Sequence, residues 1–219
     1  MLPVNEVFET IQGEATHAGT PSVFIRLQGC PVGCPWCDTR FTWNMVHEIS
    51  PGQMLVKRHS GEESHAMVPT EQLMALLGNY RSRHVVITGG EPCMNDLLPL
   101  TGQIIDAGRS AQIETSGTFP ISCDPDTWVT VSPKIAMPGG LEVRDDALRR
   151  ANEIKMPIGK PDDVLALLEL LNRHQHSDQI PIWLQPLSLS RKATELCVAN
   201  AIANGFRVSL QVHALAGWR

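Results

Sequence analysis

Short runs of apolar residues alternate with longer amphipathic segments along most of the chain. The apolar runs have the length and composition of buried strands and lie at residues 22–27, 84–88, 111–115, 128–132, 152–158, 181–186 and 206–212. The amphipathic segments predict helices at residues 70–79, 95–107, 141–150, 161–173 and 190–204. Strand followed by helix, repeated, is typical of βα units on a mostly parallel sheet.

Two of these helices carry end signals. The helix over 161–173 starts at Pro161, a residue favoured in the first helical turn. The helix over 190–204 starts on Ser190, a preferred N-cap, and is followed by Gly205, a preferred helix stop. Cys197 lies on its apolar face and is expected to pack in the core.

The number of strands favours an incomplete barrel. A closed eightfold βα barrel typically needs about 250 residues, whereas this chain has 219 residues and seven predicted strands. We therefore predict an α/β fold, a partial βα barrel formed as one domain over residues 1–219. In such folds chemistry collects at the carboxyl ends of the strands, so the loops that follow them are the expected site.

Two segments depart from the alternation. Residues 4–21 predict an extended N-terminal piece with a turn at Gly19. Residues 41–69 are polar with little periodicity and predict an insertion that acts as a lid or a family-specific addition. Its histidines are expected to be exposed loop residues rather than metal ligands: His47, His59 and His65.

Composition and charge narrow the class of function. The formal net charge is −5 and the chain has no broad basic face, so we expect no nucleic-acid partner. The most basic stretch, residues 56–60, is expected to be a solvated loop. We expect neither a secretory signal nor a membrane span, which predicts a cytoplasmic protein. In that reducing compartment the six cysteines are expected to be ligands, nucleophiles or core residues.

Three cysteines, Cys30, Cys34 and Cys37, crowd the loop after the first predicted barrel strand. A closed structural zinc site needs four ligands, and the sequence offers no second pair beside this trio. Three thiolates can instead hold a cubane iron–sulfur cluster and leave one iron open to a non-protein ligand. An incomplete zinc site and a set of reactive thiols are the alternatives.

The spacing Cys-x3-Cys-x2-Cys, with an aromatic residue at Trp36, resembles the radical S-adenosylmethionine superfamily. The next barrel strand ends on Gly89-Gly90-Glu91-Pro92, where residues without side chains let the backbone approach a ligand closely. In that superfamily this turn meets the methionyl end of the cofactor. The resemblance thus implies a backbone contact from Gly90 and a supporting carboxylate from Glu91.

Seven segments, in order, narrow the resemblance to the 7-carboxy-7-deazaguanine synthases of queuosine precursor biosynthesis. They span essentially the whole chain: NEVFETIQGE, FIRLQGCPVGCPWCDT, HVVITGGEPC, QIETSGT, TVSPK, NEIKMPIG and LQP. The family's reaction converts 6-carboxy-5,6,7,8-tetrahydropterin to 7-carboxy-7-deazaguanine, with ring contraction and loss of ammonia. It depends on a [4Fe-4S] cluster, S-adenosylmethionine and Mg²⁺. Its implied partners are an electron donor such as flavodoxin or ferredoxin and a second copy in a homodimer.

The resemblance also implies roles for individual residues. The implied metal ligands are Cys30, Cys34 and Cys37 for the cluster and Thr39 for Mg²⁺. The implied cofactor contacts are Trp36, Cys37, Asp38, Gly90, Glu91, Ser132, Pro133, Lys134 and Gln185. The implied substrate contacts are Ile11, Gln12, Gly13, Arg26, Thr88 and His213.

Residue chemistry agrees with several of these roles and leaves others open. Mg²⁺ prefers oxygen ligands and often takes few from the protein, which suits the Thr39 hydroxyl. The planar fork of Arg26 suits a substrate carboxylate, although an ordinary surface salt bridge is its alternative. Glu114 is either an acid or base toward the pterin or a structural acceptor.

The C-terminal segment departs from the family pattern. LQVHALAGWR stands where relatives commonly have Gln-Thr-His-Lys, so His213 is the one contact carried over from this tail. Two alternative functions stay open from sequence. One is a glycyl-radical activase, against which the Cys-Asp-Thr motif and Arg26 argue, and the other is a zinc-binding module.

Overall fold

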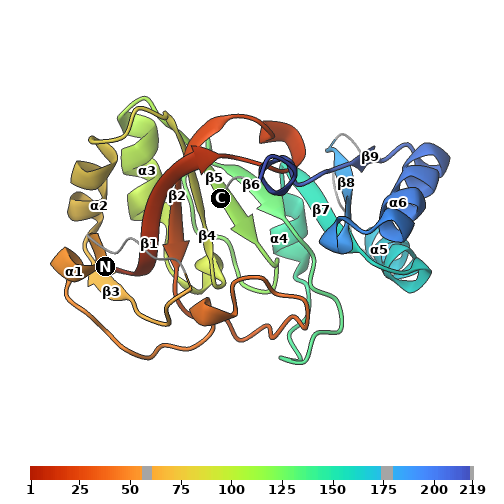
Figure 1. Ribbon diagram of the computed structural model, residues 1–219, viewed down its shortest axis with the longest axis horizontal. Coiled ribbons are helices and arrows are strands. Elements are labelled where there is room, and N and C mark those ends of the chain that lie inside the picture. The colour runs from red at the N-terminus through yellow and green to blue at the C-terminus, as the bar shows by residue number, and fades with distance from the viewer. Residues whose placement is uncertain (56–60, 174–179, 218–219) are drawn as a thin grey trace.

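The structure is a computed structural model that describes residues 1–55, 61–173 and 180–217 (Figure 1). Its strands are β1 (Leu2–Ile11), β2 (Pro21–Leu27), β3 (Ala66–Val68), β4 (His84–Gly89), β5 (Ser110–Thr115), β6 (Trp128–Val131), β7 (Glu153–Ile158), β8 (Ile182–Pro186) and β9 (Arg207–Val208). Its α-helices are α1 (Pro51–Leu55), α2 (Thr70–Leu77), α3 (Leu98–Asp106), α4 (Asp145–Arg150), α5 (Pro161–Arg173), α6 (Arg191–Asn204) and α7 (Val212–Leu215). The basic stretch 56–60, with His59, lies outside the described residues.

The described strands form one open sheet in the order β3-β1-β2-β4-β5-β6-β7-β8-β9. The strands from β2 to β9 in this order pair in parallel, and they correspond one to one to the seven predicted strands. The sheet curves without closing on itself (Figure 1). The prediction of an α/β fold with an incomplete barrel is therefore confirmed.

Two antiparallel strands extend the sheet beyond the prediction. β1 is the predicted extended N-terminal piece, and it pairs with β2 on one side and with β3 on the other. β3 and α1 lie in the insertion after the cysteine loop, which therefore has more regular structure than its weak periodicity indicated. The prediction of an exposed His65 was wrong. The residue is buried and its Nδ1 lies 3.2 Å from the Val46 carbonyl oxygen, whereas His47 is exposed as expected.

The last predicted strand was too long. β9 ends at Val208, and residues 212–215 form helix α7 instead. The Val212 amide donates to the Gly13 carbonyl at 2.9 Å, which turns the chain away from the sheet edge and across the N-terminal segment. Helices α3 and α4 also start later than predicted, at Leu98 and Asp145.

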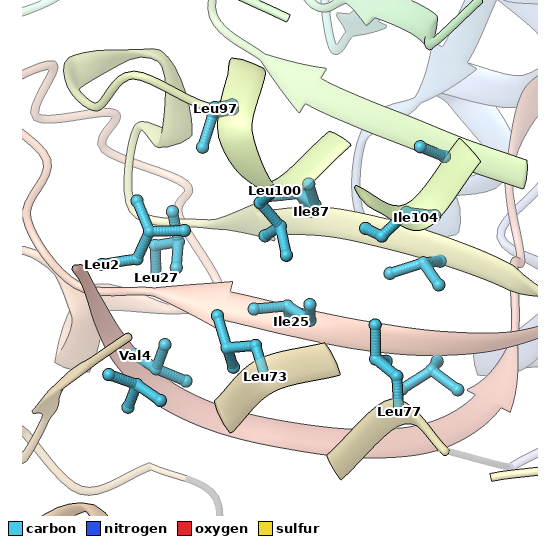
Figure 2. Close-up of a cluster of buried hydrophobic side chains, with 14 of the residues drawn as sticks. Leu2, Val4, Ile25, Leu27, Leu73, Leu77, Ile87, Leu97, Leu100 and Ile104 are labelled. Atoms are coloured by element: carbon cyan, nitrogen blue, oxygen red, sulfur yellow. The ribbon is translucent and has the colours of Figure 1, made fainter. Parts of the chain in front are cut away.

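Helices α2 to α6 cover the outer face of the sheet. Figure 2 shows Leu73 of α2 and Leu100 of α3 packed around Ile25 and Ile87 of the parallel strands. A second buried cluster joins β6, β7 and β8 to α5 and α6 and includes Cys197, which confirms its predicted place in the core. This leaves the inner face of the sheet for polar side chains.

The predicted ends of α6 are also confirmed. The Ser190 hydroxyl accepts a hydrogen bond from the Ala193 amide at 3.2 Å, and Gly205 adopts the left-handed conformation at φ 71°. Among the described residues, no helix has the length and apolar composition needed to cross a membrane.

Candidate active site

A cavity of about 570 Å³ opens at the carboxyl ends of the parallel strands. Strand alternation explains its polar lining. In β2, Ile25 and Leu27 face the helices, and Phe24 and Arg26, which alternate with them, face the cavity. The other parallel strands, or the loops directly after them, contribute Thr88, Glu114, Ser132, Lys155, Gln185 and Gln211.

Most of the sequence-predicted site residues line this one cavity: Ile11, Gln12, Arg26, Cys30, Cys34, Trp36, Cys37, Asp38, Thr39, Thr88, Gly90, Glu91, Glu114, Ser132, Lys134, Gln185 and His213. Two predicted contacts, Gly13 and Pro133, do not line the cavity. A Cβ at Gly13 would come within 1.8 Å of the His213 ring, so this glycine lets the C-terminal segment close over the site. Pro133 is buried.

The three loop cysteines lie in the wall of the cavity as free thiols. Burial raises the pKa of Cys30 to about 11 and also raises the pKa of Cys34, so both favour the neutral thiol unless a cation is bound. In the described ranges, no three His, Cys, Asp or Glu side chains converge on a position for a single metal ion. Three thiolates can hold a cubane, because each binds a different iron, whereas a closed zinc site would need a fourth ligand.

The glycine turn after β4 packs directly against the cysteine loop. The Gly90 amide donates to the Leu27 carbonyl at 2.8 Å, and a Cβ at Gly90 would lie 2.1 Å from the Gly29 carbonyl oxygen. Only a residue without a side chain fits there. The turn is therefore positioned to present backbone next to the thiols.

Glu91 has a full set of protein partners. Its buried carboxylate accepts hydrogen bonds from the Cys93 amide at 2.9 Å, the Thr115 hydroxyl at 2.6 Å and the Ser116 amide at 2.7 Å. These contacts join the ends of β4 and β5. Glu91 thus supports the glycine turn through these protein contacts, as expected of a supporting carboxylate.

Arg26 is anchored at the cavity wall rather than on the surface. Its Nε lies 2.8 Å from the Glu6 carboxylate, and the two side chains are 17% and 6% exposed. Its guanidinium carbon lies 5.5 Å from the centroid of the Phe8 ring. The alternative of an ordinary surface salt bridge does not describe this geometry.

A buried charge cluster on the inner face includes Glu14 and Lys155, to which sequence reasoning assigned no role. Lys155 Nζ contacts the Glu14 carboxylate and lies 2.6 Å from Glu114 Oε2. Gln211 Nε2 donates to Glu14 at 2.8 Å and Gln12 Nε2 donates to Glu114 at 3.2 Å. A lysine inside the apolar strand 152–158 was the available signal, but its partners come from distant parts of the chain.

The protonation of this cluster follows from its burial and from its single cation. Burial, reinforced by the Glu14 carboxylate, raises the pKa of Glu114 to about 7 against the attraction of Lys155. Burial opposes ionisation of Glu14 too, but Lys155 outweighs it and holds the Glu14 pKa at about 2. The two carboxylates raise the pKa of Lys155 despite its burial. Glu114 therefore changes between its neutral and ionised forms near neutral pH.

Lys134 is a second buried amine at the cavity wall. Its Nζ donates to the Ser132 carbonyl at 3.0 Å and to the Ser132 hydroxyl at 2.6 Å. Burial lowers the pKa of Lys134, and the nearby Cys34 opposes this effect. The amine lies between the cysteine wall and the end of β6, which suits an anionic part of a ligand.

A hydrogen-bonded layer closes the cavity toward the amino ends of the strands. The Thr130 hydroxyl and the Trp183 indole donate to the buried Glu153 carboxylate at 2.7 and 3.0 Å. The Thr16 hydroxyl, from the N-terminal segment, donates to the same carboxylate at 2.6 Å. The His17 ring lies 4.6 Å from that of His84 on this side. The N-terminal segment thus forms a floor that shields the cavity from bulk water.

The comparisons with known proteins agree with this geometry. The family described as "4Fe-4S single cluster domain" matches residues 11–118. The chain is 51% identical to the 7-carboxy-7-deazaguanine synthase of Escherichia coli strain K12 over 215 residues, 96% of both chains. It is 41% identical to the synthase of the same name from Buchnera aphidicola over 214 residues, again 96% of both.

A solved structure extends the agreement to three dimensions. The crystal structure of QueE from Escherichia coli superposes with a TM-score of 0.92 at 50% sequence identity, and the match covers 97% of this chain and 94% of that one. Sequence and fold therefore lead to the same assignment: the chain belongs to the 7-carboxy-7-deazaguanine synthase family of radical S-adenosylmethionine enzymes.

Proposed function

We propose that this protein converts 6-carboxy-5,6,7,8-tetrahydropterin to 7-carboxy-7-deazaguanine with ring contraction and loss of ammonia. The observation that carries the proposal is one cavity lined by three free thiols, a glycine turn, an anchored arginine and a buried acid pair. The thiols suit the cluster and the glycine turn suits the cofactor. The arginine suits the substrate carboxylate, and the acid pair suits the pterin edge. A glycyl-radical activase needs a pocket for S-adenosylmethionine but none for a second, carboxylated small molecule.

The residues present fit the iron–sulfur cluster and S-adenosylmethionine. Cys30, Cys34 and Cys37 would hold the cluster, and Gly90 and Lys134 line the wall where the cofactor's amino acid part is expected. When bound, the pair supplies one-electron chemistry that removes a hydrogen atom from the substrate. The chain itself positions the reactants and keeps water out through its floor.

Substrate contacts follow from the charges of the cavity. Arg26, held in place by Glu6, offers a cation to the substrate carboxylate. Glu14 and Glu114 offer acceptors to the N–H groups of a pterin edge, with Lys155 neutralising part of their charge. Gln12, Thr88 and His213 complete the proposed set.

Glu114 is proposed to give up its proton from the carboxyl group during loss of ammonia. Since the Glu114 pKa is raised to about 7, kcat should fall as the pH rises above that value. Glu114→Gln should remove this fall of kcat at high pH and lower kcat by roughly 10²- to 10⁴-fold. The measurement is kcat against pH for wild type, Glu114→Gln and the exposed control Glu169→Gln. An unchanged fall of kcat at high pH in Glu114→Gln would exclude the assignment.

Thr39 is proposed as the protein ligand of Mg²⁺. Its hydroxyl lines the cavity 3.6 Å from Cys37 Sγ, at the wall where an anionic substrate would meet the cluster loop. Thr39→Ala should raise the Mg²⁺ concentration for half-maximal activity by about tenfold or more. Activity titrated with Mg²⁺ checks this, with Thr194→Ala on α6 as the control. An identical Mg²⁺ dependence in wild type and Thr39→Ala would remove the role.

The assignment of the reaction has a direct test. The protein is reconstituted anaerobically with iron and sulfide, then incubated with a reductant, S-adenosylmethionine, Mg²⁺ and 6-carboxytetrahydropterin. The expected result is a brown protein with about four irons per chain that releases 7-carboxy-7-deazaguanine. An intact cluster without product would refute the substrate, and zinc in place of iron would refute the superfamily chemistry.

The remaining proposals concern the setting of the reaction. We infer one domain over residues 1–219, a flavodoxin or ferredoxin as electron donor and a homodimer as the assembly. A cytoplasmic location is supported by six cysteines that are all free, three of them in the cavity.

A further inference from the structure

One hydrogen bond to the cysteine loop has no role in the proposed reaction. The indole Nε1 of Trp43 lies 3.4 Å from Cys37 Sγ. An indole N–H can only donate, so the sulfur is the acceptor. Trp43 comes from the segment after the loop and lines the same cavity.

The backbone holds this indole in place. The Cys30 amide donates to the Trp43 carbonyl at 3.0 Å. The buried Gln28 side chain donates to the carbonyls of Phe41 at 2.8 Å and Asn44 at 2.7 Å. The turn that carries Trp43 is therefore tied to the end of β2 and to the cysteine loop itself, so the donor and the acceptor belong to one fixed unit.

Arg40 also contacts the Trp43 ring. Its guanidinium carbon lies 5.6 Å from the centroid of the Trp43 ring, and its Nη2 donates to the Pro35 carbonyl within the cysteine loop. Cation–π contact and hydrogen bond together connect the loop, the arginine and the indole. An aromatic ring needed only to fill space would not require its N–H to face a sulfur.

We propose that Trp43 is a positioning residue that sets the reduction potential of the iron–sulfur cluster through its N–H to Cys37. The inference rests on the proposed function, in which Cys37 is a cluster ligand. Reduction adds negative charge that spreads onto the cluster sulfurs, and a fixed N–H donor stabilises the more negative state. The hydrogen bond therefore raises the potential and makes the cluster easier to reduce.

The test compares reconstituted wild type with Trp43→Phe, which keeps an aromatic ring and removes the N–H. A redox titration followed by electron paramagnetic resonance should give a more negative midpoint potential for the variant. Trp128→Phe removes an indole N–H on the far side of the site and should leave the potential unchanged. Equal potentials in wild type and Trp43→Phe, with a full cluster in both, would overturn the proposal.

A second measurement covers the case in which Trp43→Phe does not retain its cluster. Wild type labelled with [15N-indole]tryptophan should show a 15N coupling and an exchangeable-proton coupling to the reduced cluster. Absence of both couplings would also overturn the proposal. The iron content of the wild type separates failure of this proposal from failure of the proposed function. Wild type that binds no cluster contradicts the assignment of the cysteines as ligands. A full cluster without the couplings contradicts only the role of Trp43.

Discussion

Alanine in place of Cys34 is expected to abolish turnover. Cys34 is buried in the loop between Cys30 and Cys37, and its backbone carbonyl accepts the Cys37 amide at 3.1 Å, so the loop can keep its shape without the thiol. Two thiolates leave a second iron without a protein ligand, and the cubane should not persist. Reconstituted Cys34→Ala should lack the brown chromophore and about four irons per chain, and should give no detectable product.

Cys197→Ala is the matched control for this result. Cys197 is fully buried on α6 in the second core cluster, outside the cavity. The variant therefore removes a buried thiol, as Cys34→Ala does, but away from the site. This variant should bind the same iron as wild type and turn over at a similar rate, with at most a small loss of stability. Full activity in Cys34→Ala would show that the three-cysteine loop does not hold the cluster.

The parts of the fold that sequence predicted correctly are those with local signals. The seven parallel strands are continuous apolar runs, and the ends of α6 follow from Ser190 and Gly205. β1 was recognised as extended but not as a sheet strand, because its polar positions, such as Glu6 and Glu9, interrupt the apolar pattern. The burial of His65 depends on pairing with the segment around Glu48, which no local pattern reveals.

The residues of the candidate site also divide into those with a local sequence signal and those without one. The cysteine loop and the glycine turn are contiguous motifs, and the structure brings both to one cavity wall. The cluster around Lys155 joins residues that are far apart in sequence: its contacts with Glu14 and Glu114 span 141 and 41 positions. Only the curvature of the sheet and the fold of the N-terminal segment bring them together. Sequence could indicate Glu114 as a polar strand end, but not its partners.

The second large effect is expected from Lys155→Met, which removes the cation shared by two buried carboxylates. The free energy of unfolding should fall by about 3–5 kcal/mol at pH 8, because Glu14 and Glu114 are left uncompensated. Urea denaturation of the anaerobic protein measures this. Lys160→Met is the control: Lys160 is 67% exposed and lies 3.7 Å from Asp162, and its loss should change stability by less than about 1 kcal/mol.

The pH dependence distinguishes lost charge pairing from lost packing in Lys155→Met. In wild type, Glu14 has its pKa held at about 2, below the ordinary value, so its contribution to stability is present near neutral pH and disappears only in acid. Without Lys155, burial and mutual repulsion raise the pKa of both carboxyls in the folded state. The folded protein then binds more protons than the unfolded chain, and stability falls as the pH rises through the raised values. Lys155→Met should therefore lose stability more steeply than wild type between about pH 5 and 8, and recover much of it at the acid end. A deficit of the same size at every pH would mean that Lys155 contributes packing alone, and that the carboxylates do not depend on it for their charge.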